Sequence, residues 1–457
     1  MSRTHPEAAA TFLRDPNRAA WHDEALWFVR QKRDSATALP EWEALRDAGA
    51  ALKAHAMSRL AELLEEFEAR ATAAGVVVHW ARDAAEHNAV VLELLQRAGA
   101  TRVAKSKSML TEECGLNTVL ESSGIEVVDT DLGERIVQLA HEPPSHIVLP
   151  AIHWKKEEIG ALFHRTMGTP EGESSPDALA AAARDHLRDA LLHADAAITG
   201  ANALVAETGG VVVCTNEGNA DLGMHSAPLH IVCVGIEKII ATLDDLAVLL
   251  RILARSATGQ PITAYTTHVT APRPGAAMHV VLVDNGRSAR LADAEMRSAL
   301  HCIRCGACLN TCPIYRRSGG HSYGHVIPGP IGAILAPATD LRAHRDLPFA
   351  STLCGSCGDV CPVRIDIPAQ LLAWRGRSAE AGALPLGYTS IFARLGLILA
   401  DRSRFDRAGR WARRALRLLP QALLAGRWNP WTRAGRELPL APPESFREWA
   451  RREGRLK

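Results

Sequence analysis

Seven cysteines between positions 302 and 361 are the residues of this sequence with the clearest chemistry. They form two runs, CIRCGACLNTCP (302–313) and CGSCGDVCP (354–362). The first run has the spacing of bacterial ferredoxins that hold two cubane iron–sulfur clusters, in which the fourth cysteine ligates the other cluster. Two-residue gaps let three thiolates curl around one cube, and the proline prevents a helix from continuing directly through the fourth cysteine. The sequence therefore predicts iron–sulfur clusters and electron transfer.

The ferredoxin crossover divides the seven cysteines unequally between two clusters. The first cluster receives a complete set of ligands, namely Cys302, Cys305, Cys308 and Cys361. The second cluster receives only three, namely Cys312, Cys354 and Cys357. The residue three positions before Cys354 is Ser351, the candidate fourth ligand. The expected cofactors are two [4Fe-4S] clusters, the second with an oxygen ligand, a ligand from elsewhere, an open iron or only three irons.

Zinc and disulfides are the alternatives for these cysteines. Four-cysteine zinc sites also use CxxC pairs, but a CxxCxxCxxxCP run is far more specific for iron–sulfur clusters. Ten cysteines in 457 residues are too few for a disulfide scaffold. Three cysteines, Cys114, Cys214 and Cys233, lie outside the runs. Cys214 and Cys233 lie in apolar stretches typical of core strands, whereas Cys114 does not. Any of these three could supply the missing ligand.

The elements that position the ligands fall into four predicted parts of an α/β chain. Residues 1–74 are rich in Ala, Glu and Arg at helical spacing, and residues 75–290 alternate short β-rich runs with amphipathic helices. Residues 291–370 are rich in Cys, Gly and Pro and form a ferredoxin-like module. Residues 371–457 return to a helical pattern rich in Trp, Leu and Arg.

The alternation in residues 75–290 predicts a parallel or mixed sheet that is covered by helices on both faces. Helices are expected at 83–98 and 111–122. Strands are expected at 76–80, 102–104, 125–130, 147–149, 196–199, 210–215, 230–234 and 280–283.

Glycine-rich turns at strand ends of this part, at 199–202, 207–210 and 215–219, make it a candidate for ligand binding, because backbone N–H groups are exposed there. The predicted pocket consists of Glu207, Gly209 and Gly210, with Lys105 as a partner for an anion. The competing interpretation is that these are tight turns of a scaffold. No GxGxxG motif follows the first strand and no GxxxxGK[ST] motif occurs, so the sequence does not support flavin or NAD binding.

Charge is distributed unevenly along the chain. The formal net charge is +1, yet residues 364–457 carry 19 Lys and Arg against 8 Asp and Glu. Such a basic end suits an acidic partner subunit, nucleic acid or an anionic membrane face, or is simply a solvated helical surface. No nucleic-acid motif occurs, so no nucleic-acid partner is expected. The apolar stretch at 388–400 is too short to span a bilayer and the start shows no secretory signal, so we expect a cytoplasmic protein with at most peripheral membrane contact.

The sequence resembles the lactate utilization protein B family over nearly its whole length. The resemblance is carried by KSKSMLTEECGLN (105–117), ITGANALVAETGGVVVCTNEGNADL (198–222), CIRCGACLNTCPIYR (302–316), GGHSYGHVIPGPIG (319–332) and LCGSCGDVCPVRI (353–365). It implies an α/β domain related to sugar-phosphate isomerase and CoA-transferase folds, a two-cluster ferredoxin-like module and a family-specific C-terminal segment. The family's second cluster also has three cysteines. Asp221 stands where many relatives carry a basic residue.

The resemblance also implies a complex with a Cys-rich oxidoreductase subunit and a smaller protein that shares the α/β domain, which together oxidise L-lactate to pyruvate. The chain is then expected to be an electron-transfer subunit rather than a stand-alone enzyme. Three alternatives stay open. The chain could serve another 2-hydroxy-acid dehydrogenase, it could be catalytic itself through an open iron that polarises a hydroxyl group, or it could be a cluster-based redox sensor.

Overall fold

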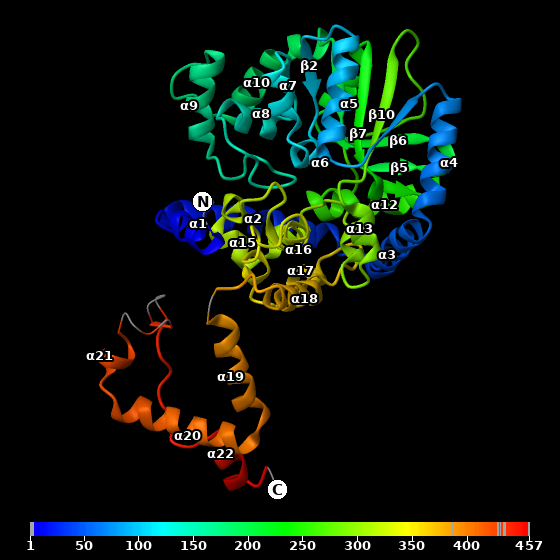
Figure 1. Ribbon diagram of the computed structural model, residues 1–457. Coiled ribbons are helices and arrows are strands. Elements are labelled where there is room, and N and C mark those ends of the chain that lie inside the picture. The colour runs from blue at the N-terminus through cyan, green and yellow to red at the C-terminus, as the bar shows by residue number, and fades with distance from the viewer. Residues whose placement is uncertain (1–3, 386, 427–428, 430, 433–435, 456–457) are drawn as a thin grey trace. The chain divides into compact units, whose positions relative to one another are not determined.

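The computed structural model describes residues 4–385, 387–426, 429, 431–432 and 436–455. The chain forms two compact units, Met1–Glu380 and Ala381–Lys457. The first unit contains the α/β sheet and all seven cysteines of the two runs (Figure 1). Each unit is described by itself below.

A six-stranded, fully parallel sheet is the centre of the first unit, which confirms the predicted α/β class. The strand order is β1-β10-β7-β4-β2-β3, with every neighbouring pair parallel. Central strands such as β4 and β7 are buried along their whole length, which is why their sequences are continuous apolar runs. The strands are β1 (Val77–Ala81), β2 (Arg102–Lys105), β3 (Glu126–Asp129), β4 (Ala196–Thr199), β7 (Leu229–Gly235) and β10 (Ala277–Val283).

Helices cover both faces of this sheet (Figure 1). Alternate residues of one strand enter two different cores, because successive side chains point to opposite faces. In β10, Val281 and Val283 pack with the helices on one face, whereas Val280 and Leu282 pack in the core on the other. The helices of this part are α5 (Ala84–Arg97), α6 (Met109–Glu113), α7 (Leu116–Ser122), α8 (Leu132–Leu139), α9 (Lys156–Met167), α10 (Pro176–Leu192) and α11 (Asn219–Ser226).

A second, smaller sheet has the order β8-β5-β6-β9 and mixes parallel and antiparallel pairs. It packs beside α4 (Leu60–Ala73) and α12 (Leu243–Ala257). Three of its strands were not predicted, because they have only two to five residues each and show no clear alternation. These strands are β5 (Ala203–Val205), β8 (Ile239–Ile240) and β9 (Tyr265–Val269), and they pair around β6 (Gly210–Thr215).

Two predicted elements differ from the structure. Residues 147–149 form bends rather than a strand. The Nδ1 atom of His146 accepts the N–H groups of Val148 and Leu149, each at 3.0 Å, so these groups are not free for a neighbouring strand. The helix predicted at 111–122 is split into α6 and α7 at Gly115, whose φ of 64° is left-handed.

The N-terminal helices pack on the cysteine-rich segment instead of forming a separate part (Figure 1). Leu26, Trp42 and Leu52 share one core with Cys305 and Cys361. Asp15 caps the longest of these helices by accepting the N–H group of Arg18 at 2.9 Å. The helices are α1 (His5–Phe12), α2 (Pro16–Ala36) and α3 (Trp42–Ser58).

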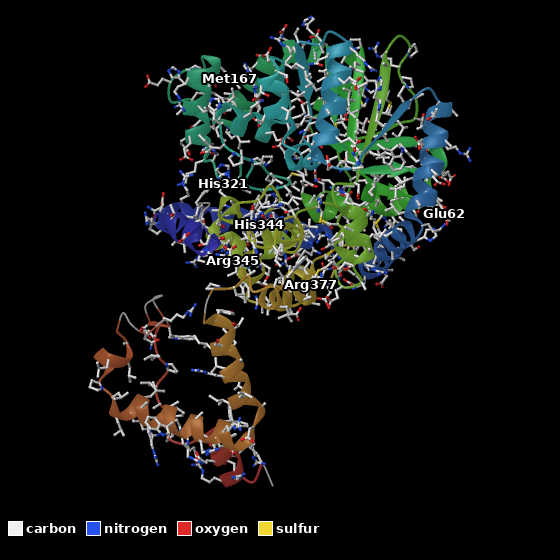
Figure 2. The ribbon with its side chains drawn as sticks, in the orientation of Figure 1. Glu62, Met167, His321, His344, Arg345 and Arg377 are labelled. Atoms are coloured by element: carbon white, nitrogen blue, oxygen red, sulfur yellow. The ribbon has the colours of Figure 1, made fainter. Side chains whose placement is uncertain are left out.

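The cysteine-rich segment consists of loops and mostly short helices, and Cys308 and Cys357 lie within two of these helices. Arg377 in the last of these helices forms ion pairs with Asp293 and Glu295, which fixes the end of the module to the segment that leads into it (Figure 2). His321 lies on the opposite side of the module, where its Nε2 atom contacts the carbonyl of Pro143 at 2.8 Å (Figure 2). The helices are α13 (Arg287–Ala292), α14 (Ala307–Thr311), α15 (Pro313–Ser318), α16 (Gly329–Leu335), α17 (Ser356–Asp359) and α18 (Ile367–Glu380).

The second unit is helical and exposes many large apolar side chains. Its described helices are α19 (Tyr388–Ala400), α20 (Arg402–Leu418), α21 (Gln421–Leu424) and α22 (Phe446–Arg452). Neither α19 nor α20 has a buried residue. Trp411 and Leu418, for example, are 76% and 79% exposed. Within the described ranges, no helix is both long enough and apolar enough to cross a membrane.

Candidate functional site

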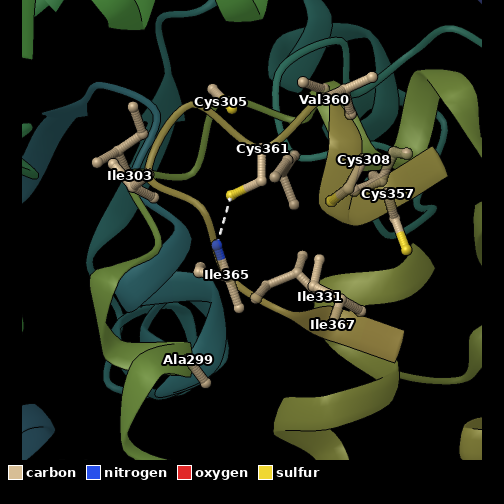
Figure 3. Close-up of a cluster of buried hydrophobic side chains, with 14 of the residues drawn as sticks. Ala299, Ile303, Cys305, Cys308, Ile331, Cys357, Val360, Cys361, Ile365 and Ile367 are labelled. Atoms are coloured by element: carbon tan, nitrogen blue, oxygen red, sulfur yellow. Dashed lines mark hydrogen bonds between the residues drawn. The ribbon is translucent and has the colours of Figure 1, made fainter. Parts of the chain in front are cut away.

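The four cysteines assigned to the first cluster surround one small apolar cavity. It is lined by Cys302, Cys305, Cys308 and Cys361. Isoleucines complete the wall, among them Ile303, Ile331 and Ile367 (Figure 3). Three of these cysteines are buried, and Cys302 is half-buried. In the part of the chain that the structure describes, no three His, Cys, Asp or Glu side chains are gathered as they are around a single metal ion.

Backbone N–H groups point at the sulfur atoms of this first set. The N–H of Ile365 donates to Cys361 Sγ at 3.4 Å (Figure 3), and the N–H of Arg304 donates to Cys302 Sγ at the same distance. Hydrogen bonds of this kind stabilise thiolate sulfur and tune the potential of a bound cluster.

The loops that carry the cysteines hold unusual backbone conformations in both runs. Arg304 has a φ of 61° and Gly306 a φ of 75°, so left-handed residues flank Cys305. In the second run, Leu353 has a φ of 55° and Gly355 a φ of 86°, one on each side of Cys354. Non-glycine residues adopt this region rarely and often at functional sites. The two runs therefore share a local backbone shape as well as a spacing.

The second set of cysteines is more open than the first. Cys312 and Cys357 are buried, but Cys354 is exposed. Ser351 stands in this run where Cys302 stands in the first, and its Oγ atom accepts the N–H of Leu353 at 3.0 Å. That bond repeats the bond from Arg304 N–H to Cys302 Sγ, because donor and acceptor are two residues apart in both cases.

Arginines from the N-terminal helices hold the loop that ends at Cys361. Arg33 donates to the carbonyl of Val360 at 3.0 Å. Arg46 donates to the carbonyl of Cys361 at 3.0 Å and to that of Gly358 at 3.4 Å. Both arginine side chains are largely buried. These contacts fix the position of Cys361 from a part of the chain more than 300 residues away in sequence.

Burial controls the charge of the cysteine thiols. It raises the pKa of Cys305 to about 12, of Cys357 to about 12 and of Cys361 to about 11, although backbone N–H groups act in the opposite direction. Buried thiolates therefore need positive charge beside them, which the iron of a cluster supplies. Sulfur ligands, an apolar wall and N–H donors together fit an iron–sulfur cluster.

The predicted ligand pocket at Glu207, Gly209, Gly210 and Lys105 is not where the large cavity of this unit lies, since none of the four residues lines it. The exposed Glu207 accepts the N–H of Leu243 at the start of α12. A Cβ atom on Gly209 would come within 2.4 Å of a backbone nitrogen in α4, and one on Gly210 would meet a histidine ring of β9. These residues serve close packing.

Lys105 is fully buried in a carboxylate cluster. Its Nζ atom lies 2.7 Å from Asp129, 3.1 Å from Glu112 and 3.9 Å from Glu134. Burial disfavours the ammonium, but the three carboxylates outweigh it and raise the pKa of Lys105. The side chain thus holds β2 to β3 and the neighbouring helices rather than an outside anion.

The large cavity has a volume of about 310 Å³ and lies at the carboxyl ends of the parallel strands. Residues just beyond β2, β4, β7 and β10 line it, including Lys107, Asn202, Lys238 and Arg287. Ligands bind at this edge of open α/β sheets because loops and backbone N–H groups converge there. The cavity is the best candidate for a small-molecule site in the described part of the first unit.

The cysteine module closes this cavity. Ile303 and Arg304, the two residues between Cys302 and Cys305, belong to its wall. Ile303 and Ile147 line both the large cavity and the smaller one around the first cysteine set. A molecule in the cavity would therefore be separated from the first cluster by a single layer of side chains.

Two of the three glycine-rich turns predicted from the sequence, 199–202 and 215–219, line this cavity. Lys238 and Arg304 were not predicted, because Lys238 follows β7 in an unremarkable IEKII stretch and Arg304 lies between two cysteines. A Glu-Lys pair at the carboxyl end of a buried strand was the one available signal. The arginines that hold the Cys361 loop carried no signal, because their partners are distant backbone carbonyls.

Comparison with known proteins identifies two domains in the chain. A family model of the LUD domain matches residues 64–288, and one of a 4Fe-4S dicluster domain matches residues 298–365. Lactate utilization protein B of Shouchella clausii is 43% identical over 75% of this chain and 73% of its own length. The protein of the same name from Bacillus licheniformis is 38% identical over 92% and 91%. An Escherichia coli protein described as an uncharacterized electron transport protein, YkgF, is 40% identical over 90% and 88%.

A LUD domain joined to a 4Fe-4S dicluster domain defines the chain as an iron–sulfur protein. Relatives that match nearly end to end then give the family itself. The chain belongs to the lactate utilization protein B family.

Proposed function

We propose that this chain is the iron–sulfur electron-transfer subunit of a cytoplasmic complex that oxidises L-lactate to pyruvate. The observation that carries the proposal is the cavity at the sheet edge, whose wall includes the residues between Cys302 and Cys305. A domain able to hold a small molecule is thus in direct contact with a set of cluster ligands. The names of the relatives support lactate as the substrate of the complex.

The proposed cofactors are two [4Fe-4S] clusters, each of which exchanges one electron at a time when bound. Cys302, Cys305, Cys308 and Cys361 would hold the first. Cys312, Cys354 and Cys357 would hold the second, with Ser351 at the position of the fourth ligand. The repeated hydrogen bond to Ser351 Oγ and Cys302 Sγ supports this role for Ser351. An open iron or a three-iron second cluster is the alternative.

Residues of the chain provide the apolar and hydrogen-bonding surroundings of the proposed first cluster. Isoleucines around the first set exclude water, and the N–H groups of Arg304 and Ile365 stabilise negative charge on sulfur. Arg33 and Arg46 hold the Cys361 loop in place. Rigid ligands reduce the structural change that accompanies each electron transfer, which favours a relay.

The proposed partners are a Cys-rich oxidoreductase subunit and a smaller protein that shares the α/β domain. The second unit offers a docking surface for them. Helix α20 presents seven arginines and one aspartate, and it also exposes Phe405, Trp411 and Leu418. Basic and apolar side chains on one exposed helix favour an acidic partner with apolar contacts.

Reconstitution tests the proposal. The chain and its two partners would be purified anaerobically, mixed, and assayed for lactate-dependent reduction of a dye, with glycolate as the competing 2-hydroxy acid. We expect activity with lactate that requires this chain and is lost in Cys308→Ala. Equal activity without the chain would contradict an electron-transfer role, and a preference for glycolate would assign the complex to another 2-hydroxy acid.

A further inference from the structure

The wall of the cavity at the sheet edge includes two cationic side chains, Lys238 and Arg304, that form no ion pair within the described residues, although the carboxylate of Glu237 interacts with both at longer range. Among the described residues, no hydrogen bond or ion pair engages the ammonium of Lys238. Its neighbour Glu237 is hydrogen-bonded to Arg287. The Nη1 atom of Arg304 is buried and has no hydrogen-bond partner in the described part of the chain. A buried charged donor without a partner is costly, which applies to Arg304, and the half-buried Lys238 reaches the same cavity, so both side chains are available to a bound anion.

The other two cationic side chains of the same wall, Lys107 and Arg287, have hydrogen-bond or ion-pair partners within the protein, unlike Lys238 and Arg304. Lys107 donates to the carbonyl of Val148 at 2.9 Å and lies 3.4 Å from Asp131. Arg287 forms ion pairs with Glu113 at 3.0 Å and with Glu237.

The carboxyl group of Glu217, in another part of the wall, can form a hydrogen bond with a hydroxyl group of a ligand. Glu217 accepts the N–H of Leu132 at 3.1 Å. Burial and the neighbouring Asp131 raise the pKa of Glu217 to about 7. A carboxyl group that is partly protonated at neutral pH can donate or accept a hydrogen bond from a hydroxyl or carbonyl oxygen.

We propose that this cavity binds a small 2-hydroxy or 2-oxo monocarboxylate, with its carboxylate paired to Lys238 and Arg304. This inference rests on the proposed function only for the class of acid. The cavity, at about 310 Å³, has the size of a small-ligand site. Its position at the carboxyl ends of the strands is where such sheets bind ligands.

Binding of an acid in this cavity would also change the reduction potential of the first cluster. Arg304 lies between Cys302 and Cys305, so an anion that pairs with it removes positive charge from beside the cluster ligands. Less positive charge nearby favours the oxidised, less negative cluster. The reduction potential of the first cluster therefore shifts to a more negative value when the acid is bound.

Calorimetric titration of the anaerobically purified, cluster-loaded full chain tests the proposal. The probes are L-lactate, pyruvate, propionate, which lacks an oxygen at C2, and inorganic phosphate. We expect saturable binding of lactate or pyruvate, weaker binding of propionate and no competition by phosphate. In Lys238→Gln the affinity should fall about tenfold or more, as for the loss of one charged hydrogen-bond partner. In Lys156→Gln, which removes an exposed lysine outside the cavity, it should not change.

Each contrary result has a distinct meaning. Absence of binding to the native chain overturns the inference whatever the variants do, while lactate-dependent activity of the reconstituted complex would preserve the proposed function. Equal binding of propionate, or tighter binding of phosphate, overturns the assignment to 2-hydroxy and 2-oxo acids. An EPR-monitored redox titration gives a second measurement, in which an unchanged potential on addition of pyruvate overturns the coupling through Arg304.

Discussion

The two cysteine runs have similar spacing and similar backbone, yet the protein treats them differently. In the first set, Cys305, Cys308 and Cys361 are buried around an apolar cavity. In the second set, Cys354 is exposed and a serine occupies the fourth position. No cysteine of either set lines the large cavity of the α/β domain, but Ile303 and Arg304, which lie between two first-set cysteines, belong to its wall.

If both sets hold clusters, as proposed, this difference favours a division of labour between them. A buried cluster beside a ligand cavity is suited to receive electrons from chemistry near the sheet. A cluster with an exposed ligand is suited to pass them to a partner, since electron transfer between proteins requires close approach at the surface. Local sequence similarity thus hides a functional asymmetry that only burial reveals.

The largest expected effect is a contrast between two cysteine substitutions. Cys308→Ala removes a buried ligand from the core shared with the N-terminal helices, so we expect loss of the first cluster and a poorly folded module. Cys354→Ala removes an exposed ligand, so the protein should stay folded with about four irons per chain. Iron and sulfide analysis with circular dichroism measures both. Identical behaviour of the two variants would remove the asymmetry.

Exposure to oxygen should separate the clusters in time. The second cluster is expected to be lost first, so iron falls from about eight to about four per chain before the protein precipitates. Ser351→Cys completes a four-cysteine set and should slow this first loss several-fold, followed by the decay of visible absorbance. Ser403→Cys, which adds a cysteine on the exposed surface of α20, is the matched control and should not slow it. Simultaneous loss of both clusters would contradict the account.

The arginine contacts to the Cys361 loop should contribute to stability as buried charged hydrogen bonds do. Arg46→Leu leaves the carbonyls of Cys361 and Gly358 without their donor, and we expect it to lower the free energy of unfolding by about 2–4 kcal/mol. Arg59→Leu removes an exposed pair with Glu62 and should cost about 0–1 kcal/mol. Anaerobic guanidinium unfolding compares the two. An equal cost would mean that the first set does not depend on α3.

The smallest expected effect is the contribution of one buried histidine of the sheet to the acid sensitivity of the fold. His230 is buried in β7 beside the hydroxyl of Thr199, at 2.8 Å, and burial lowers its pKa to about 4. Below pH about 6.5 the unfolded chain binds a proton that the folded chain refuses, so stability falls as the pH drops towards 4. At pH 5 the loss is about 2 kcal/mol.

His230→Asn should remove this loss, and His193→Asn, at an exposed position, should keep it. Unfolding at pH 7.5 and pH 5 measures the difference for each variant. If acid destabilises the native chain and His230→Asn alike, His230 does not contribute to the acid sensitivity, which then belongs to other buried groups such as His146 and His301.

Spacing and periodicity predicted the parts of this protein that depend on local sequence. The cysteine runs, the α/β class and most strands of the parallel sheet follow from patterns along the chain. Contacts between distant segments did not. The Cys361 loop is held by Arg33 and Arg46 from helices near the N-terminus, and His146 redirects the backbone at 147–149.

The ligand site shows the same limit. The glycine-rich turn at Glu207 was predicted to form a ligand pocket, yet Gly209 and Gly210 permit close packing on α4 and β9. The cavity is instead assembled from the ends of several strands and from Arg304 of the cysteine module. The turns at 199–202 and 215–219 could be predicted from the sequence, whereas the contributions of Lys238 and Arg304 depend on contacts between distant segments.

The most direct test of the central claim is iron and sulfide analysis of the anaerobically purified chain, with EPR spectra of the isolated and reduced states. The account predicts about eight irons and a reduced-state signal from two interacting clusters. About seven irons with a three-iron signal in the oxidised state would remove Ser351 as a ligand and leave a relay of unequal clusters. Zinc without an EPR signal in either state would contradict the claim that the seven cysteines bind iron–sulfur clusters.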